Sequence, residues 1–173
     1  LESIRMLVGE LAAELGLTVP VSVGVMIETP ASAVLAERFA RTADFLSIGT
    51  NDLTQYTLAM DRGHPGLAAR LDALHPAVLE LIAASAAAAR AHGRHAALCG
   101  GLASEPLAAP LLVGLGVNEL SAVPAVIPAI KACLGAVTLE RCRALAAEAR
   151  RQESAAAVRA LLARELGEGE VRT

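Results

Sequence analysis

A repeating unit runs through most of this sequence: a short β-rich run, a Gly, Ser, Thr or Pro break, and then an alanine-rich helical stretch. The β-rich runs are Val21–Glu28, Asp44–Gly49, His95–Cys99 and Asn118–Ser121. Strands joined through helices, with no hairpin turn between them, pair in parallel. The first run is almost continuously apolar, which is typical of a strand buried on both faces. The repeat predicts an α/β fold with about four parallel strands and covering helices.

Start and stop signals place the helices between these strands. Thr29 and Pro30 predict an N-cap and a first helical residue. Residues 50–75 form a long polar segment. It is longer than a usual βα loop, and such long loops often carry functional residues. We expect helices over residues 1–16, from Pro30 through Arg41, from Pro76 to about His92, from Ser104-Glu105-Pro106 to Gly114 or Gly116, from Pro124 to about Leu134, and over 138–173, where Thr138 and Ser154 act as caps.

Chain length separates two architectures that contain such repeats. A doubly wound open sheet and a (β/α)8 barrel both fit the pattern, but a complete barrel takes roughly 250 residues. The chain has 173 residues. We therefore expect a single partial domain over 1–173, namely half of a (β/α)8 barrel. Its exposed strand edge would need a partner, either a second copy or upstream sequence.

Composition and charge exclude several classes of protein. The chain has 15 basic and 18 acidic side chains, a balance that argues against nucleic-acid binding. Its mean hydropathy is +0.50, yet the longest uncharged stretches, Leu15–Ile27 and Pro106–Asn118, fall short of the about 20 residues of a membrane span. An odd number of cysteines without a CxxC pair favours a reducing compartment. The expected location is the cytoplasm.

Acidic residues at two strand ends are the first candidates for a site. In parallel α/β folds the functional groups gather at the carboxyl ends of the strands. Glu28 ends the first run, and Asp52 follows the second. Two such carboxylates suit Mg²⁺, which keeps waters and binds substrate phosphate oxygens. The alternatives are a helix-capping role for Glu28 and a turn role for Asp52.

A thiol and an arginine complete the candidates. Cys99 precedes a Gly-Gly turn whose backbone N–H groups could bind an anion. The alternative is that Cys99 is a buried structural cysteine. For Cys133 and Cys142 we expect that structural role. The Arg62 guanidinium can bind a phosphate or carboxylate through two hydrogen bonds, or it can form a solvent-exposed ion pair with Asp61. The four histidines have no metal-ligand spacing.

Several segments closely resemble Enzyme I of the bacterial phosphoenolpyruvate:sugar phosphotransferase system. They are Gly24–Val34, Phe45–Gly63, Leu98–Gly100 and Ile127–Lys131. The run IGTNDLTQYTLA, followed by Asp-Arg-Gly, is highly specific, because phosphoenolpyruvate synthase and pyruvate phosphate dikinase share only its GTNDLTQ core. The resemblance covers about three quarters of the chain. It implies the second half of a (β/α)8 phosphoenolpyruvate-binding domain.

The same resemblance assigns roles to the candidate residues. Glu28 and Asp52 would be Mg²⁺ ligands, Asn51, Asp52 and Arg62 would bind phosphoenolpyruvate, and Cys99 would protonate the enolate to give pyruvate. The family passes the phosphoryl group to a histidine on a separate domain and then to an HPr-type phosphocarrier, which starts sugar uptake. Family members are cytoplasmic homodimers, so we expect a homodimer here.

Departures from the family pattern limit what this chain can do alone. The acceptor-histidine motif and two substrate-gripping arginines are absent, and Gly101 stands where the family has Glu, with Glu105 a few residues later. We therefore expect the isolated chain to be inactive. Alternative readings are a piece of a phosphoenolpyruvate synthase or dikinase, or a non-catalytic dimerisation or regulatory fragment.

Overall fold

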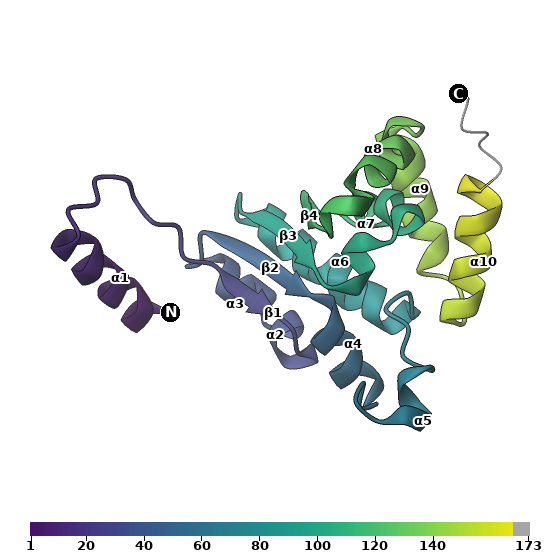
Figure 1. Ribbon diagram of the computed structural model, residues 1–173, viewed down its shortest axis with the longest axis horizontal. Helices are drawn as coiled ribbons and strands as arrows, with labels where there is room; N and C mark the ends of the chain where they lie inside the picture. The colour runs from purple at the N-terminus through teal and green to yellow at the C-terminus, as the bar shows by residue number, and fades with distance from the viewer. Residues whose placement is uncertain (168–173) are drawn as a thin grey trace.

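The computed structural model describes residues 1–167 and contains a four-stranded parallel sheet in the order β1-β2-β3-β4. Figure 1 shows the strands side by side in chain order. Their bounds are β1 (Val25–Ile27), β2 (Phe45–Gly49), β3 (His95–Cys99) and β4 (Glu119–Ser121). A doubly wound sheet reverses its strand order at a switch point, whereas neighbours in a barrel wall follow one another in sequence. The predicted α/β fold and its half-barrel arrangement are therefore confirmed.

The two faces of the sheet differ in burial. Ile27, Ile48 and Leu98 share one row of the register and are fully buried. On the opposite face, Met26 is 45% exposed and Glu119 is exposed. Helices thus cover one face only, as they do outside a barrel wall, and the prediction that the first strand is buried on both faces is wrong.

The first strand is also shorter than predicted. Instead of starting at Val21, β1 starts at Val25. The Asp44 carboxylate accepts a hydrogen bond from the Val23 N–H at 2.7 Å, and the Asp44 N–H donates to the Val23 carbonyl at 3.0 Å. This exchange between Val23 and one aspartate takes the place of the strand ladder, so β2 likewise begins after Asp44.

Nine helices follow β1 within the described residues. They are α2 (Pro30–Val34), α3 (Ala36–Ala40), α4 (Thr50–Leu58), α5 (Pro65–Ala68), α6 (Pro76–Ala91), α7 (Ala109–Gly114), α8 (Ile127–Gly135), α9 (Leu139–Ala149) and α10 (Ala155–Leu166). Short 3₁₀ turns span Gly101–Ser104, Pro106–Ala108 and Pro124–Val126. The predicted caps are confirmed, since the hydroxyls of Thr29, Thr138 and Ser154 each accept a backbone N–H.

Several predictions for the segments between the strands need correction. The single helix expected from Pro30 is divided, because Leu35 adopts φ −96° and ψ 10° between α2 and α3. The helices expected from Ser104 and from Pro124 begin as 3₁₀ turns before α7 and α8. Residues 50–75 are not one loop, because α4 begins directly where β2 ends.

Alanine-rich helices make the main core against the covered face of the sheet. Helix α6 buries a stripe formed by Val78, Ile82 and Ala86, and it packs against α2, α3, β2 and β3. Small side chains let these helices approach closely; a Cβ at Gly114 of α7 would lie within 2.9 Å of the Ala146 side chain of α9. The body of the protein is therefore tightly packed between α2 and α10.

The N-terminal helix lies apart from this body. Figure 1 shows α1 (Glu2–Glu14) to one side, joined by an extended segment. It has no buried residue and reaches the body through Arg5, which forms an ion pair with Asp44 at 2.9 Å and donates to the Thr42 carbonyl at 2.7 Å. Residues 168–173, part of the predicted segment 138–173, lie outside the described residues. No helix in residues 1–167 is long and apolar enough to cross a membrane.

Candidate functional site

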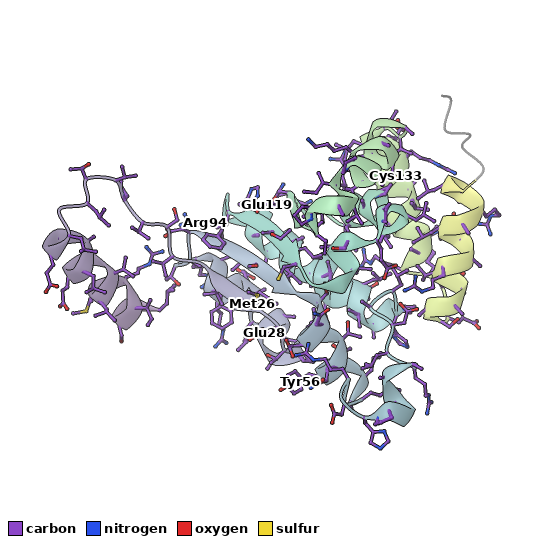
Figure 2. All side chains as sticks on the ribbon, viewed as in Figure 1. Met26, Glu28, Tyr56, Arg94, Glu119 and Cys133 are labelled. Carbon is purple, nitrogen blue, oxygen red and sulfur yellow. The ribbon has the colours of Figure 1, made fainter. Side chains whose placement is uncertain are left out.

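Strand register brings the predicted strand-end residues to one level. Gly49 pairs with Cys99, and Cys99 pairs with Ser121. Glu28 follows the pair Ile27–Ile48 and so lies level with Gly49; a Cβ at Gly49 would be 3.4 Å from Glu28 Oε2. Figure 2 shows Glu28 at this end of the sheet, beside the helix that carries Tyr56. Glu28 and Cys99 therefore share the carboxyl edge of the sheet.

Helix α4 begins at this edge and carries two of the candidates. Gly49 is its N-cap, and the side chains of Asn51 and Asp52 project from its first turn. Asp52 is therefore a helical residue rather than a turn residue. The first N–H groups of a helix have no partner within the helix, and its dipole favours a negative charge there. A helix that starts at a strand end is a suitable place for a phosphate.

Hydrogen bonds join the segments that follow β2 and β3. Thr50 Oγ1 donates to the Cys99 carbonyl at 2.8 Å, and Asn51 Oδ1 accepts from the Gly101 N–H at 2.9 Å. Gly100 has φ +100°, and a Cβ there would lie 2.4 Å from Thr50 Oγ1, so only glycine fits. The Gly101 N–H thus binds Asn51 and is not open to an anion, which corrects the expectation for the Gly-Gly turn.

Arg62 folds back toward the start of α4. Its Nη2 lies 3.1 Å from Asp52 Oδ1, and its backbone N–H donates to Gln55 Oε1 at 3.1 Å. Asp61 instead accepts the Gly63 N–H at 2.7 Å. The alternative pairing of Arg62 with Asp61 is therefore wrong, and the guanidinium lies beside Asp52 at the start of α4.

A cleft of about 210 Å³ gathers part of the site. Its lining includes the candidates Asn51 and Arg62 and also Thr50 and Gly101. Asp52 does not line the cleft but pairs with Arg62 beside it, and Glu28 and Cys99 lie along the sheet edge. The complete lining is Thr50, Asn51, Thr54, Arg62, Leu71, Asp72, Ala73, Gly101, Leu102, Glu105 and Arg159. The structure thus unites Asn51, Asp52 and Arg62, with Glu28 and Cys99 at the same edge of the sheet.

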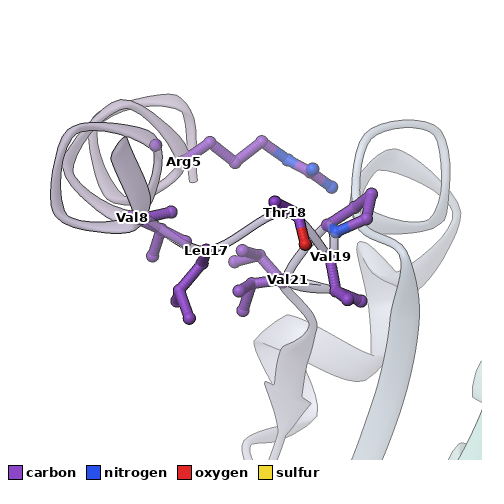
Figure 3. Close-up of a pocket in the computed structure, with 10 residues that line it drawn as sticks. Arg5, Val8, Leu17, Thr18, Val19 and Val21 are labelled. Carbon is purple, nitrogen blue, oxygen red and sulfur yellow. The ribbon is translucent and has the colours of Figure 1, made fainter. Parts of the chain in front are cut away.

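A second hollow lies far from the predicted site residues. Figure 3 shows Arg5 reaching from α1 over a space of about 290 Å³ whose lining includes Val8, Leu17, Val19 and Val21. None of the predicted site residues lines it. The site at the carboxyl edge of the sheet is therefore the better candidate for chemistry.

The donor set at the sheet edge suits a hard cation. Within residues 1–167 no group of three or more His, Cys, Asp or Glu side chains forms a metal cage. Mg²⁺ does not require one, because it is usually held by one or two carboxylates together with waters and phosphate oxygens. Glu28 is exposed and Asp52 half-buried, so both carboxylates are open to such a hydrated ion.

The remaining cysteines and histidines have ordinary structural surroundings. Cys142 is buried, and burial raises the pKa of its thiol, whereas Cys99 and Cys133 are half-buried. His64 and His75 use their Nδ1 atoms to cap α5 and α6. The predicted burial is therefore confirmed for Cys142 and wrong for Cys133, and His64 and His75 act as helix caps.

Sequence reasoning missed five residues that hold the site together. Thr50 and Gln55 lie inside the GTNDLTQ run, where their polar side chains were a usable signal. Asp72, Glu105 and Arg159 line the cleft, and Arg159 pairs with both carboxylates. Arg159 lies 87 residues from Asp72, so no local pattern connects them.

Comparisons with known proteins agree with this geometry. Residues 1–139 match the family model described as "PEP-utilising enzyme, PEP-binding domain". The chain is 50% identical over 166 residues to a multiphosphoryl transfer protein of Xanthomonas campestris, covering 96% of this chain and 20% of that protein. It is 44% identical over 132 residues to a phosphoenolpyruvate-protein phosphotransferase of Streptomyces coelicolor, covering 76% and 24% respectively.

A solved structure supports the fold alone. A citrate lyase from Burkholderia xenovorans superposes with a TM-score of 0.57 at 20% identity, covering 94% of this chain and 58% of that one. The chain spans about a fifth to a quarter of the length of the two curated relatives described above. Since the family model covers most of the chain and the carboxyl edge carries the expected side chains, the chain belongs to the PEP-utilising enzymes and forms part of their PEP-binding domain.

Proposed function

We propose that this chain binds phosphoenolpyruvate as part of a phosphoenolpyruvate-protein phosphotransferase. The observation that carries the proposal is the meeting of the α4 N-terminus, Arg62 and the turn after β3 at one cleft. Relatives named phosphoenolpyruvate-protein phosphotransferase are 42–44% identical over at least three quarters of the chain. Fold, site and relatives therefore favour the same activity.

Substrate binding relies on positive charge and backbone donors. Arg62 and the first turn of α4 would bind the phosphate, with Asn51 as a further polar contact. Arg62 is paired with Asp52 in this structure, so a bound phosphate would take over the guanidinium. Glu28 and Asp52 would hold Mg²⁺, which neutralises phosphate charge when it is bound.

The proposed reaction balances with one thiol proton. A nitrogen lone pair of a histidine outside this chain forms the N–P bond, while the P–O bond to the enol oxygen breaks and leaves an enolate. The enolate carbon takes the proton of the Cys99 thiol, which gives pyruvate, and solvent returns a proton to the thiolate. Positioning and charge neutralisation supply most of such a rate enhancement. Cys99 therefore acts as a general acid.

The cellular role extends beyond this chain. We propose that the phosphoryl group passes from the histidine to an HPr-type phosphocarrier and that the protein serves sugar uptake in the cytoplasm as a homodimer. Free cysteines support the reducing compartment. The relatives named multiphosphoryl transfer protein support a fused, multidomain setting. The 173-residue chain should bind substrate but transfer no phosphoryl group by itself.

Calorimetric titration of phosphoenolpyruvate into this chain, with and without Mg²⁺, tests the proposal. The key variant is Asp52→Asn, and Glu37→Gln is its matched control, because Glu37 is also a first-turn acid paired with an arginine. We expect saturable binding that needs Mg²⁺ and is weakened at least about tenfold by Asp52→Asn but not by Glu37→Gln. Binding with an affinity that depends on neither Mg²⁺ nor Asp52 would overturn the assigned site. Absence of binding would show that this chain cannot bind phosphoenolpyruvate by itself.

A further inference from the structure

One arginine of the C-terminal helix lies on the far wall of the cleft. Arg159 of α10 contacts Asp72, ten residues beyond Arg62, and Glu105, four residues beyond Gly101. These two carboxylates belong to the segments that follow β2 and β3. A single side chain therefore touches both segments that build the candidate site.

All three nitrogens of the Arg159 guanidinium donate hydrogen bonds to the two carboxylates. Arg159 Nε lies 2.6 Å from Asp72 Oδ2 and its Nη2 2.9 Å from Asp72 Oδ1. Its Nη1 lies 2.9 Å from Glu105 Oε2. A lysine has one compact ammonium and cannot reproduce this planar set of donors. The bridge between the two segments is thus specific to arginine.

Both ends of the bridge are anchored to rigid parts of the protein. Helix α10 buries Val158, Leu161 and Leu162 beside Arg159. Asp72 Oδ1 also accepts the N–H of Leu74, which is 1% exposed. Partial burial opposes ionisation of Asp72, but the hydrogen bonds from Arg159 and Leu74 outweigh it and lower the pKa of the carboxyl below its usual value. The bridge is therefore charged at neutral pH.

The bridge and the substrate-side residues face the same space. The cleft is lined by Thr50, Asn51 and Arg62 as well as by Asp72, Glu105 and Arg159. Only four residues separate Glu105 from Gly101, whose N–H donates to Asn51 at 2.9 Å. Restraint of Glu105 and Asp72 by α10 therefore also restrains the turn at Gly101 and the segment after Arg62.

We propose that Arg159 is a positioning residue that holds the segments after β2 and β3 in the arrangement that presents Arg62 and Asn51 to substrate. Arg159 acts through Asp72 and Glu105 and does not itself touch the substrate. The substrate named here rests on the proposed function, whereas the ordering of the two segments does not.

Amide hydrogen exchange of Arg159→Met tests the ordering without any ligand. Arg150→Met is the matched control, because Arg150 makes a two-point ion pair with Glu80 between α9 and α6 and has a similar side-chain exposure, 43% against 47%. We expect exchange of residues 63–75 and 101–105 to be about tenfold faster in Arg159→Met than in the wild type, and unchanged there in Arg150→Met. Arg159→Lys should give an intermediate rate.

Equal exchange of these segments in the two arginine variants would overturn the proposal, because Arg159 would then be only one surface ion pair among several. Should Arg159→Met fail to fold, Glu105→Gln removes one partner and should speed exchange at residues 101–105 alone. Titration of phosphoenolpyruvate with Mg²⁺ gives the second readout, where we expect Arg159→Met to weaken binding about five- to tenfold and Arg150→Met to leave it unchanged. If the wild type binds no phosphoenolpyruvate, the claim that this chain binds it by itself fails, while the exchange rates still decide the role of Arg159.

Discussion

The first and last helices of the described chain are similar in length but opposite in their surroundings. Helix α1 has 13 residues and buries none of them, whereas the 12-residue α10 buries Val158, Leu161 and Leu162. Figure 1 shows α1 apart from the body and α10 against α9. Each is attached by an arginine, but Arg5 reaches one carboxylate and Arg159 reaches two.

The two helices differ in whether their apolar side chains pack against the rest of the protein. Helix α1 exposes Ile4, Met6, Leu7 and Leu11 by 46% to 68%, and the hollow of Figure 3 adjoins it. A short helix gains most of its stability from packing of its apolar face. Helix α1 therefore lacks the packing that stabilises α10, and of the two helices only α10 contributes to the folded core.

Truncation of one leucine in each helix should show the largest difference. Leu161 is 1% exposed, so Leu161→Ala should lower the free energy of unfolding by about 2–5 kcal/mol. Leu11 is 46% exposed, and Leu11→Ala should change it by less than about 0.5 kcal/mol. Urea unfolding followed by circular dichroism measures both. Losses of similar size in the two variants would mean that α1 is packed in solution.

Sequence patterns predicted the order of the helices and strands but not the residues at which they begin and end. Hydrophobic runs and caps such as Thr29, Thr138 and Ser154 have local causes, so they are readable one segment at a time. The start of β1 depends on the Asp44 side chain, which bonds to Val23 across 21 residues. A side-chain hydrogen bond that takes the place of strand pairing produces no periodic pattern in the sequence, so the start of β1 could not be predicted.

The site divides in the same way. Glu28 and Cys99 were predictable because the carboxyl ends of neighbouring parallel strands meet at one edge. The bridge of Arg159 was not, because its partners are 87 and 54 residues away and nothing local marks α10 as part of the site. Tertiary ion pairs of this kind become visible only once helices are placed around the sheet.

Acid titration should distinguish the α10 bridge from an uncharged contact. The folded-state pKa of Asp72 is lowered, so the pair with Arg159 stabilises the protein above the ordinary Asp pKa of about 3.9. That stabilisation is lost as the pH falls through the lower, folded-state pKa. Since both side chains are partly solvated, Arg159→Met should cost only about 1 kcal/mol at pH 7.

Urea unfolding of the wild type and Arg159→Met between pH 7 and pH 2.5 measures this difference. We expect the gap between the two proteins to close toward the acid end, while the gap for Leu161→Ala persists because no proton is involved. A constant gap for Arg159→Met across the range would contradict an electrostatic role and leave only the packing of its aliphatic stem.

Removal of Arg5 should have the smallest effect on the body of the protein. The Arg5 hydrogen bond and the Val23 N–H both lower the pKa of Asp44. In Arg5→Met the Val23 contact remains, so the start of β2 keeps its partner. We expect no resolvable change in the urea midpoint, but faster amide exchange in residues 2–14, because α1 then loses its ion pair with Asp44 and its bond to the Thr42 carbonyl.

Arg41→Met is the control for Arg5→Met, because Arg41 also pairs with one exposed carboxylate, that of Glu37, at 2.9 Å. It should leave exchange in residues 2–14 at the wild-type rate. A fall in the urea midpoint of Arg5→Met as large as that of Arg159→Met would contradict the contrast between the helices. It would mean that α1 is coupled to the core through Asp44, since the Val23–Asp44 contact before β1 and the helix would then unfold as one unit.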